Sequence, residues 1–257
     1  MNQCINTVIC DDVLDGLKKI ENNSVSLIFT SPPYNVGMLY GNHNDRMTYS
    51  DYLDWLKTIF LECRRVLKTG GRLAVNIDMT RNIEDDSKEY SHPIYADLIN
   101  INRENDFLFR TEICWYKQNV VGRATAWGSY KSPKNPIVRR IHEYILVWSK
   151  DQYGLDGDGV SDLTKEEFCN YTLSTWFVQP ETKKRGGHPC PFPVELPRRA
   201  IKLFTFQNDI VLDPFAGIGT TCVAAKILGR RYIGIDNNQS FVDYADKRLI
   251  SEQDIFQ

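Results

Sequence analysis

Short apolar runs alternate with segments of helical periodicity along most of the chain. The runs predict seven strands, over Thr7–Cys10, Val25–Thr30, Arg72–Ile77, Thr111–Tyr116, Tyr144–Trp148, Ile210–Asp213 and Arg231–Ile235. Helical spacing of apolar residues predicts helices over Tyr52–Leu67, Gly219–Leu228 and Ser240–Leu249. The first helix should stop at Gly70–Gly71, and Ser240 should be the N-cap of the last. This alternation predicts an α/β fold with a mostly parallel sheet and helices on both faces.

Length and composition narrow the picture. The chain has 257 residues, of which 42% are hydrophobic, so we expect one domain over residues 1–257 with small insertions. The net charge of -2 implies that any nucleic-acid contact is made by local basic surface. No apolar run is long enough to cross a bilayer, so we expect a cytoplasmic protein. The seven cysteines are scattered without a CxxC pair, and we expect no disulfide framework and no metal.

The segment from Asn208 to Thr221 has the pattern of a strand, a glycine-bearing turn and a helix. Gly217 and Gly219 allow close approach of a ligand, and the helix that follows directs N–H groups toward an anionic group. Asp236 ends the next strand, where a carboxylate can accept hydrogen bonds from ribose hydroxyls. A nucleoside-containing cofactor is therefore indicated. The alternative is a turn that only joins strand to helix, and a dinucleotide is disfavoured because Cys222 replaces the third glycine.

A second motif, Thr30-Ser31-Pro32-Pro33-Tyr34-Asn35, follows a buried strand directly. Its prolines fix the backbone and remove two N–H donors, so the loop presents the Ser31 hydroxyl and the Pro32 carbonyl as acceptors. An exocyclic amino group suits such acceptors, because holding its hydrogens favours a pyramidal nitrogen with an exposed lone pair. Tyr34 could stack on a base swung out of a duplex. The alternative is a rigid turn with a packed tyrosine.

Three further segments join these motifs: Val8-Ile-Cys-Asp-Asp12-Val-Leu, Arg65-Val-Leu-Lys-Thr-Gly-Gly and His188-Pro-Cys-Pro-Phe192-Pro-Val-Glu-Leu-Pro. Together they resemble the β group of restriction-modification amino-methyltransferases, in which the catalytic motif precedes the cofactor motif. The resemblance covers nearly the whole chain. It implies a Rossmann-like, S-adenosylmethionine-dependent methyltransferase fold with a seven-stranded sheet and permuted motif order.

The resemblance also implies roles for individual residues. Ser31, Pro32, Pro33 and Tyr34 would be catalytic. In the family, the segment aligned with Asp12 recognises the adenine of the cofactor, and the segment with Phe192 packs over its methionine end. The motifs and the resemblance together assign to S-adenosyl-L-methionine the residues Asp12, Thr30, Phe192, Asp213, Phe215, Ala216, Gly217, Gly219, Thr220, Thr221 and Asp236.

The resemblance makes double-stranded DNA the expected substrate, and it leaves open both the existence of a cognate restriction endonuclease and the choice between monomer and homodimer. Relatives with Ser at the first motif position more often act on cytosine N4, and those with Asp usually act on adenine N6. Ser31 therefore favours cytosine N4, with adenine N6 as the alternative. An RNA or protein amino-methyltransferase and a cofactor-binding relative without catalysis are more distant alternatives. A Cys190 nucleophile is rejected because it would leave the Ser31–Tyr34 loop unexplained.

DNA contact is expected in a basic and aromatic stretch between residues 115 and 150 and in a second basic cluster. The candidate side chains are Lys117, Arg123, Lys131, Lys134, Arg139, Arg140, Lys183, Lys184 and Arg185. Target recognition is expected in residues 78–107 and 122–135. Trp115, Tyr144 and Trp148 are interpreted as core residues, and the acidic run Asp151–Glu167 as a solvated surface.

Overall fold

The computed structural model of the protein describes most of the chain. The described residues are 4–35, 39–40, 43–44, 47–78, 81–85, 88–117, 130–134, 136, 138, 140–181, 186–187 and 191–251.

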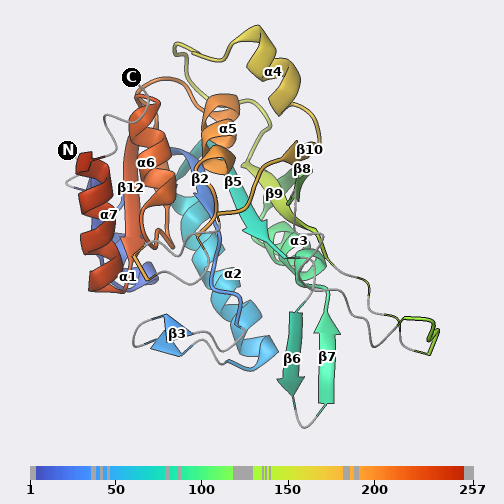
Figure 1. Ribbon diagram of the computed structural model, residues 1–257. Helices are drawn as coiled ribbons and strands as arrows, with labels where there is room; N and C mark the ends of the chain where they lie inside the picture. The colour runs from blue at the N-terminus through green and yellow to red at the C-terminus, as the bar shows by residue number, and fades with distance from the viewer. Residues whose placement is uncertain are drawn as a thin grey trace.

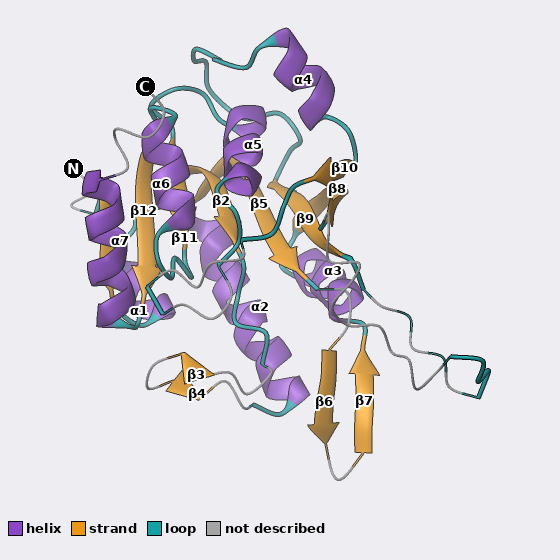
Figure 2. Cartoon of the chain, viewed as in Figure 1, coloured by secondary structure: helices purple, strands orange, loops and turns teal. Residues whose placement is uncertain are grey.

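A mostly parallel sheet forms the centre of the molecule (Figures 1 and 2). Within the described residues its eight strands lie in the order β1 (Thr7–Cys10), β12 (Arg231–Asp236), β11 (Ile210–Asp213), β2 (Val25–Thr30), β5 (Leu67–Ile77), β9 (His142–Lys150), β8 (Phe107–Tyr116) and β10 (Thr175–Phe177). The first five are parallel, β9 is antiparallel to both β5 and β8, and β10 is parallel to β8.

All seven strands predicted from the sequence are present, and the predicted Rossmann-like fold is confirmed. The eighth strand, β10, was not predicted, because its three residues are too short to show a period of two.

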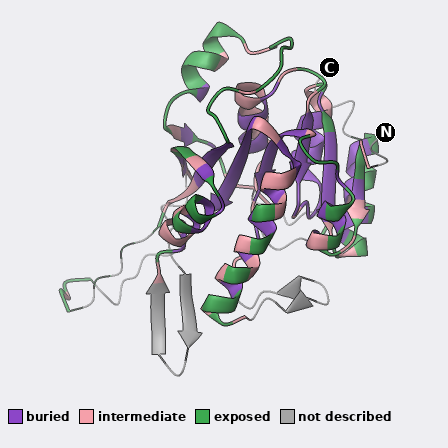
Figure 3. Cartoon of the chain, turned by 180° about the vertical axis from the view of Figure 1, so that it is seen from behind, coloured by how far each residue is buried: buried purple, intermediate pink, exposed green. Residues whose placement is uncertain are grey.

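Helices cover both faces of the sheet. On one face, α1 (Val13–Lys18), α2 (Tyr49–Val66) and α3 (Ile94–Glu104) close one apolar core, and on the other face α5 (Glu195–Phe204), α6 (Thr220–Ile227) and α7 (Gln239–Ser251) close a second. Side chains of the central strands alternate between these cores, and Figure 3 shows the strands as the most buried part of the chain. No helix in the described part of the chain is long and apolar enough to span a membrane.

Two predicted helix ends were wrong. The helix α2 ends at Val66, and the backbone of Leu67 is already extended because it pairs with Val25, so Gly70 and Gly71 lie inside β5. The helix α7 begins at Gln239, and the Asn238 side chain accepts from the N–H of Ser240, so Asn238 caps this helix. At the end of α2, backbone pairing with Val25 fixed the boundary. At the start of α7, the side chain of Asn238 fixed it.

Two short antiparallel hairpins lie outside the main sheet. They are β3 (Leu39–Tyr40) with β4 (His43–Asn44), and β6 (Arg81–Asp85) with β7 (Lys88–His92). The second hairpin lies within residues 78–107, the range expected to recognise the target, but the α3 helix in the same range is part of the core, with Ile94 and Leu98 fully buried.

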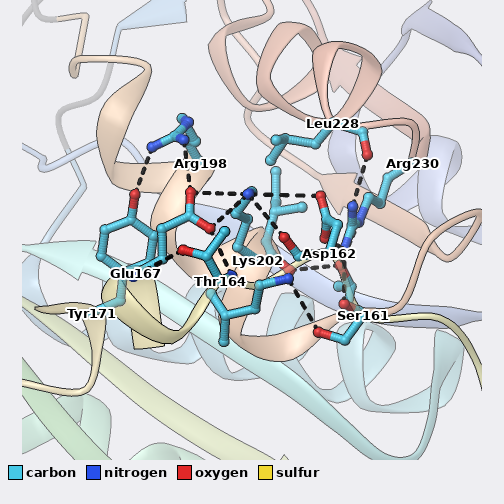
Figure 4. Close-up of polar contacts among 12 residues, drawn as sticks. Ser161, Asp162, Thr164, Glu167, Tyr171, Arg198, Lys202, Leu228 and Arg230 are labelled. Carbon is cyan, nitrogen blue, oxygen red and sulfur yellow. Dashed lines mark hydrogen bonds and ion pairs between the residues drawn. The ribbon is translucent and has the colours of Figure 1, made fainter. Parts of the chain in front are cut away.

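A polar network fastens the segment that carries α4 (Lys165–Tyr171) to the rest of the molecule (Figure 4). Arg230 Nη2 lies 2.7 Å from Asp162 Oδ1, and the Glu167 carboxylate receives Lys202 Nζ at 2.8 Å and Arg198 Nη2 at 3.0 Å. The interpretation of 151–167 as an entirely solvated acidic run was therefore wrong at Asp162 and Glu167, whose side chains turn toward cations of α5 and of the residue before β12.

Candidate active site

The two motifs leave the sheet at neighbouring strand ends. β11 and β2 are parallel neighbours, and their last residues, Asp213 and Thr30, are joined by a hydrogen bond of 2.7 Å from Thr30 Oγ1 to Asp213 Oδ1. The chain continues from β11 to α6 on one face of the sheet, whereas β2 leads to α2 on the other. This is the point in an open α/β sheet where a ligand crevice forms.

Asp213 is the centre of this junction. Its side chain is 1% exposed and also accepts from Thr221 Oγ1 at 2.8 Å and from the N–H of Phe215 at 3.1 Å. Burial, with a smaller contribution from the charge of Asp236, raises the pKa of Asp213 to about 6 although its three hydrogen bonds work in the opposite direction. Asp213 was predicted to contact the cofactor, and its position beneath the turn points to holding the turn in shape.

The glycine turn depends on left-handed backbone at Gly217 (φ 50°) and Gly219 (φ 74°). A Cβ atom at Gly219 would lie 2.8 Å from the Cβ of Ala245 on α7, so the helix packs directly on the turn. The N–H of Gly217 donates to Asp236 Oδ2 at 2.9 Å, and is thus engaged within the protein. Gly219 is the N-cap of α6 without a side-chain hydrogen bond, so the first turn of α6, at Thr220 and Thr221, offers the donors expected for an anion.

The ends of β1 and β12 complete the predicted cofactor site. Cys10 pairs with Asp236, and the N–H of Asp11 donates to the Asp236 carbonyl at 3.0 Å, which brings Asp12 and Asp236 to the same edge. Burial raises the pKa of Asp236, and each of its carboxylate oxygens accepts one backbone N–H, which leaves lone pairs for ribose hydroxyls. Asp12 is exposed and caps α1.

Phe192, which was predicted to pack over the methionine end of the cofactor, makes an aromatic contact beside the end of β2. The ring of Phe192 meets Phe29, the residue before Thr30, edge to face at 5.7 Å. The residues present therefore fit S-adenosyl-L-methionine: carboxylates at the nucleoside end, an uncapped helix start for a carboxylate, and aromatic cover.

The Ser31–Tyr34 loop is held by a chain of polar contacts. The Tyr34 hydroxyl lies 3.0 Å from Ser31 Oγ and 3.4 Å from the main-chain carbonyl oxygen of Asn76 at the end of β5. Because a carbonyl only accepts, the Tyr34 proton goes to Asn76 and Ser31 donates to the Tyr34 oxygen. Both lone pairs of the Ser31 hydroxyl then remain as acceptors, as the predicted chemistry requires.

Three residues around this loop, Asn76, Glu143 and Tyr52, were missed in the sequence, and Asn35 stood in the motif without an assigned role. The side-chain amide of Asn76 donates to Glu143 at 2.8 Å, the Tyr52 hydroxyl donates to the Pro33 carbonyl at 2.7 Å, and the Asn35 amide exchanges two hydrogen bonds with the backbone of Met47. Asn76 lies near the end of a predicted strand, and that position was the signal for it in the sequence. Tyr52 and Glu143 carry no comparable signal.

The predicted DNA-contact residues fall into three groups. In the first group, Lys117 forms an ion pair with Glu143, and Arg140 lies 3.4 Å from Asp78. In the second, Lys131 and Lys134 are exposed. The remaining candidates lie outside the described residues, and they are Arg123, Arg139, Lys183, Lys184 and Arg185.

Residues 122–129, most of the second predicted recognition segment, also lie outside the described residues. The core interpretation is confirmed for Trp115 and Trp148, which are buried in the two different cores. Tyr144 is partly exposed and packs against the core of Trp148.

The chain is similar to known DNA methylases and methyltransferases. Residues 25–247 match the model of a family described as DNA methylase. The type II methyltransferase M.MjaVI of Methanocaldococcus jannaschii is 40% identical over 178 residues, which are 69% of this chain and 88% of the relative. The DNA adenine methyltransferase YhdJ of Escherichia coli is 29% identical over 266 residues, with 95% of this chain and 82% of the relative covered.

Two solved structures share the fold. A protein of Thermus thermophilus described as a DNA modification methylase, in complex with S-adenosyl-L-methionine, superposes with a TM-score of 0.78 at 29% identity over 97% of this chain and 95% of the other. The cytosine-N4-specific PvuII DNA methyltransferase gives a TM-score of 0.72 at 18% identity over 96% of this chain and 86% of the other, which indicates a common fold.

Proposed function

The chain belongs to the DNA methylase family, as an S-adenosyl-L-methionine-dependent methyltransferase of the restriction-modification type that acts on cytosine N4 or adenine N6, and we propose that its target is cytosine N4 in duplex DNA. The choice of cytosine rests on Ser31 at the first position of the catalytic loop, and the observation that carries the methyl-transfer chemistry is the 2.7 Å hydrogen bond between Thr30 and Asp213. It places the start of the Ser31–Tyr34 loop beside the start of the cofactor turn, so the methyl donor and the acceptor amine would meet between them. In such a system, a cognate restriction endonuclease is a candidate partner.

At the acceptor, Ser31 and Pro32 would hold the two hydrogens of the exocyclic amine. The bound cofactor supplies an electrophilic methyl group. The lone pair of the amine is conjugated with the ring, and two acceptors on its hydrogens favour a pyramidal nitrogen that can attack. Ser31 is suited because its own proton is directed to Tyr34, and the Pro33 carbonyl is engaged by Tyr52, which leaves the Pro32 carbonyl for this role. Direct transfer then needs no covalent enzyme intermediate.

The target base would have to leave the duplex to reach this loop. Extrusion costs a few kcal/mol, and stacking on an aromatic ring returns roughly 1–3 kcal/mol. Tyr34 is partly exposed, and its hydroxyl is fixed by Ser31 and Asn76, so the ring is held in one orientation before the base arrives. This supports a stacking role for Tyr34.

Cofactor binding would use the turn and the neighbouring strand ends. We assign the ribose hydroxyls to Asp236, the adenine edge to Asp12 and the carboxylate of the methionine moiety to the first turn of α6. Phe215 and Phe192 would cover the cofactor, while Thr30, Asp213 and Thr221 hold the turn in place.

The exposed lysines Lys131 and Lys134 are assigned to the DNA backbone. Each substitution by Ala should weaken binding uniformly across sequences and lower the salt dependence of the affinity by about one unit of slope. Titration of labelled duplex at several salt concentrations measures this slope, and an unchanged slope would remove the residue from the interface.

The proposed chemistry is tested with mixed-sequence duplex DNA and methyl-labelled S-adenosylmethionine, followed by digestion to nucleosides and mass spectrometry. N4-methylcytosine is the expected product. Tyr34→Ala should keep cofactor binding and lose most methyl transfer, and Asp236→Ala should weaken cofactor binding first. Full transfer by Tyr34→Ala would overturn the role of the loop, and an absence of label in DNA would direct the search to RNA or protein.

Adenine N6 is the second candidate, favoured by the 29% identity to the DNA adenine methyltransferase of Escherichia coli. The same acceptor geometry serves either amine, so N6-methyladenine in the assay would keep the mechanism and correct only the base.

A further inference from the structure

The amino-terminal half of α2 contacts both the catalytic loop and the cofactor turn. Thr48 caps the helix, and the residue before it, Met47, exchanges two backbone hydrogen bonds with the side chain of Asn35, at 2.8 and 2.9 Å. One turn into the helix, Tyr52 reaches Pro33 inside the loop. One turn further, Trp55 meets Phe215 of the cofactor turn. A single rigid element thus touches both halves of the site.

Tyr52 makes a buried hydrogen bond to one carbonyl of the catalytic loop. The side chain is 2% exposed, and its hydroxyl donates to the carbonyl oxygen of Pro33 at 2.7 Å. That carbonyl belongs to the peptide unit that leads into Tyr34, and proline fixes the preceding backbone angle. The hydrogen bond therefore sets the plane of the peptide from which the Tyr34 ring projects. Asn35, with φ of 52°, is held on the other side of Tyr34 by Met47.

The contact of Trp55 completes a path across the site. Its ring lies 6.1 Å from that of Tyr52 at 30° and 5.6 Å from that of Phe215 at 51°. The backbone N–H of Phe215 is in turn fixed by Asp213. A ligand that restrains Phe215 would restrain Trp55, and through Tyr52 the peptide at Pro33. Packed aromatic rings transmit such a restraint because the interior is close-packed.

We propose that Tyr52 is a positioning residue for the catalytic loop and that Trp55 couples occupation of the cofactor site to the geometry of that loop. The proposal rests on the catalytic role proposed above for Ser31–Tyr34. Tyr52 touches neither reactant and acts through Pro33, whereas Trp55 acts through Phe215. Cofactor binding and base placement would then favour each other, and by linkage the coupling is the same in both directions.

The decisive variant is Tyr52→Phe, which keeps the ring and removes only the hydroxyl. We expect the single-turnover rate of methyl transfer to fall about 10-fold, as the loss of one buried hydrogen bond predicts, while the Kd for S-adenosylmethionine stays within about twofold. Trp55→Leu should instead raise that Kd severalfold and slow transfer as well. Asn35→Asp, which replaces the donation to the Met47 carbonyl with a carboxylate oxygen that faces it, should slow transfer as well.

Tyr171→Phe is the matched control. It also removes a hydrogen-bonded hydroxyl, at 2.6 Å from Arg198, but far from the loop. It should leave both the single-turnover rate and the Kd for S-adenosylmethionine unchanged. If the effect of Tyr52→Phe were a general loss of packing, the rate would fall equally in both tyrosine variants and the Tm would be lower. If Tyr52→Phe transfers methyl groups at the full rate while Tyr34→Ala does not, the positioning role is overturned and the catalytic loop stands. If Tyr34→Ala also transfers at the full rate, the loop assignment itself fails.

Discussion

Two inward-facing carboxylates at opposite ends of the sheet have opposite surroundings. Asp213, at the carboxyl end of β11, is surrounded by neutral donors, two threonine hydroxyls and a backbone N–H, and its pKa is raised to about 6. Glu167, on α4 near the amino end of β12, receives Lys202 and Arg198 (Figure 4). Burial acts to raise its pKa too, but the hydrogen bonds from Lys202 and Thr164 outweigh it and lower the pKa to about 2.

The difference separates two uses of an inward-facing acid. Glu167 is neutralised by permanent partners, so its environment is complete and serves to attach α4 to α5. Asp213 has hydrogen bonds but no cation among its partners in the described residues, and the same edge carries Asp236, whose pKa is also raised by burial. Carboxylates that lack compensating cations cluster where a ligand is expected to supply part of the environment.

The largest effect should come from removing Asp213. Asp213→Ala breaks the hydrogen bonds to Thr30 and Thr221 that hold the loop and the turn together, so the methyl transfer rate should fall by about 100-fold or more. Transfer of labelled methyl groups to DNA, normalised to folded protein, measures it.

A matched pair at Thr221 sharpens this result. Thr221→Ser keeps the hydroxyl that donates to Asp213 and should stay near the wild-type rate, whereas Thr221→Val should lose activity. Equal rates in the two variants would show that this hydrogen bond does not support the site.

Removing the charge of Glu167 should lower the free energy of unfolding and leave the rate of methyl transfer unchanged. Glu167→Gln removes the nearest carboxylate of Lys202 and Arg198, which keep the longer ion pairs with Asp162 and Glu195, and we expect the free energy of unfolding to fall by about 2–3 kcal/mol. Denaturant unfolding measures this loss. The transfer rate per folded molecule should equal that of the wild type, and a slower rate would contradict the separation of the two regions.

The pH dependence of stability should have opposite signs for the two acids. The raised pKa of Asp213 means that its contribution is fully present below about pH 4 and is lost as the pH rises toward 6. The lowered pKa of Glu167 means that its contribution is present above about pH 4.5 and is lost as the pH falls toward 2. Each slope should be at most about 1.4 kcal/mol per pH unit.

Unfolding of the wild type, Asp213→Ala and Glu167→Gln over a pH series tests both signs. The difference between wild type and Asp213→Ala should grow as the pH falls from 6 to 4, and that between wild type and Glu167→Gln should shrink as it falls from 4.5 to 2. Two differences that both grow, or both shrink, as the pH falls would contradict the comparison.

The sequence by itself determined the fold class, the seven main strands and the two motifs. It could do so because apolar periodicity and glycine and proline placement are local signals, and the carboxyl ends of parallel strands meet at one edge. Ser31 and Asp213 were found in this way.

Only the tertiary structure decided which polar side chains pair. Tyr52 and Asn76 reach the catalytic loop from α2 and β5. Glu143 of β9 accepts from Asn76 and pairs with Lys117, and Asp162 and Glu167 turn inward. Hydrogen bonds and ion pairs form between groups far apart in the chain, and their partners are set by sheet order and helix placement. A local pattern does not contain that information.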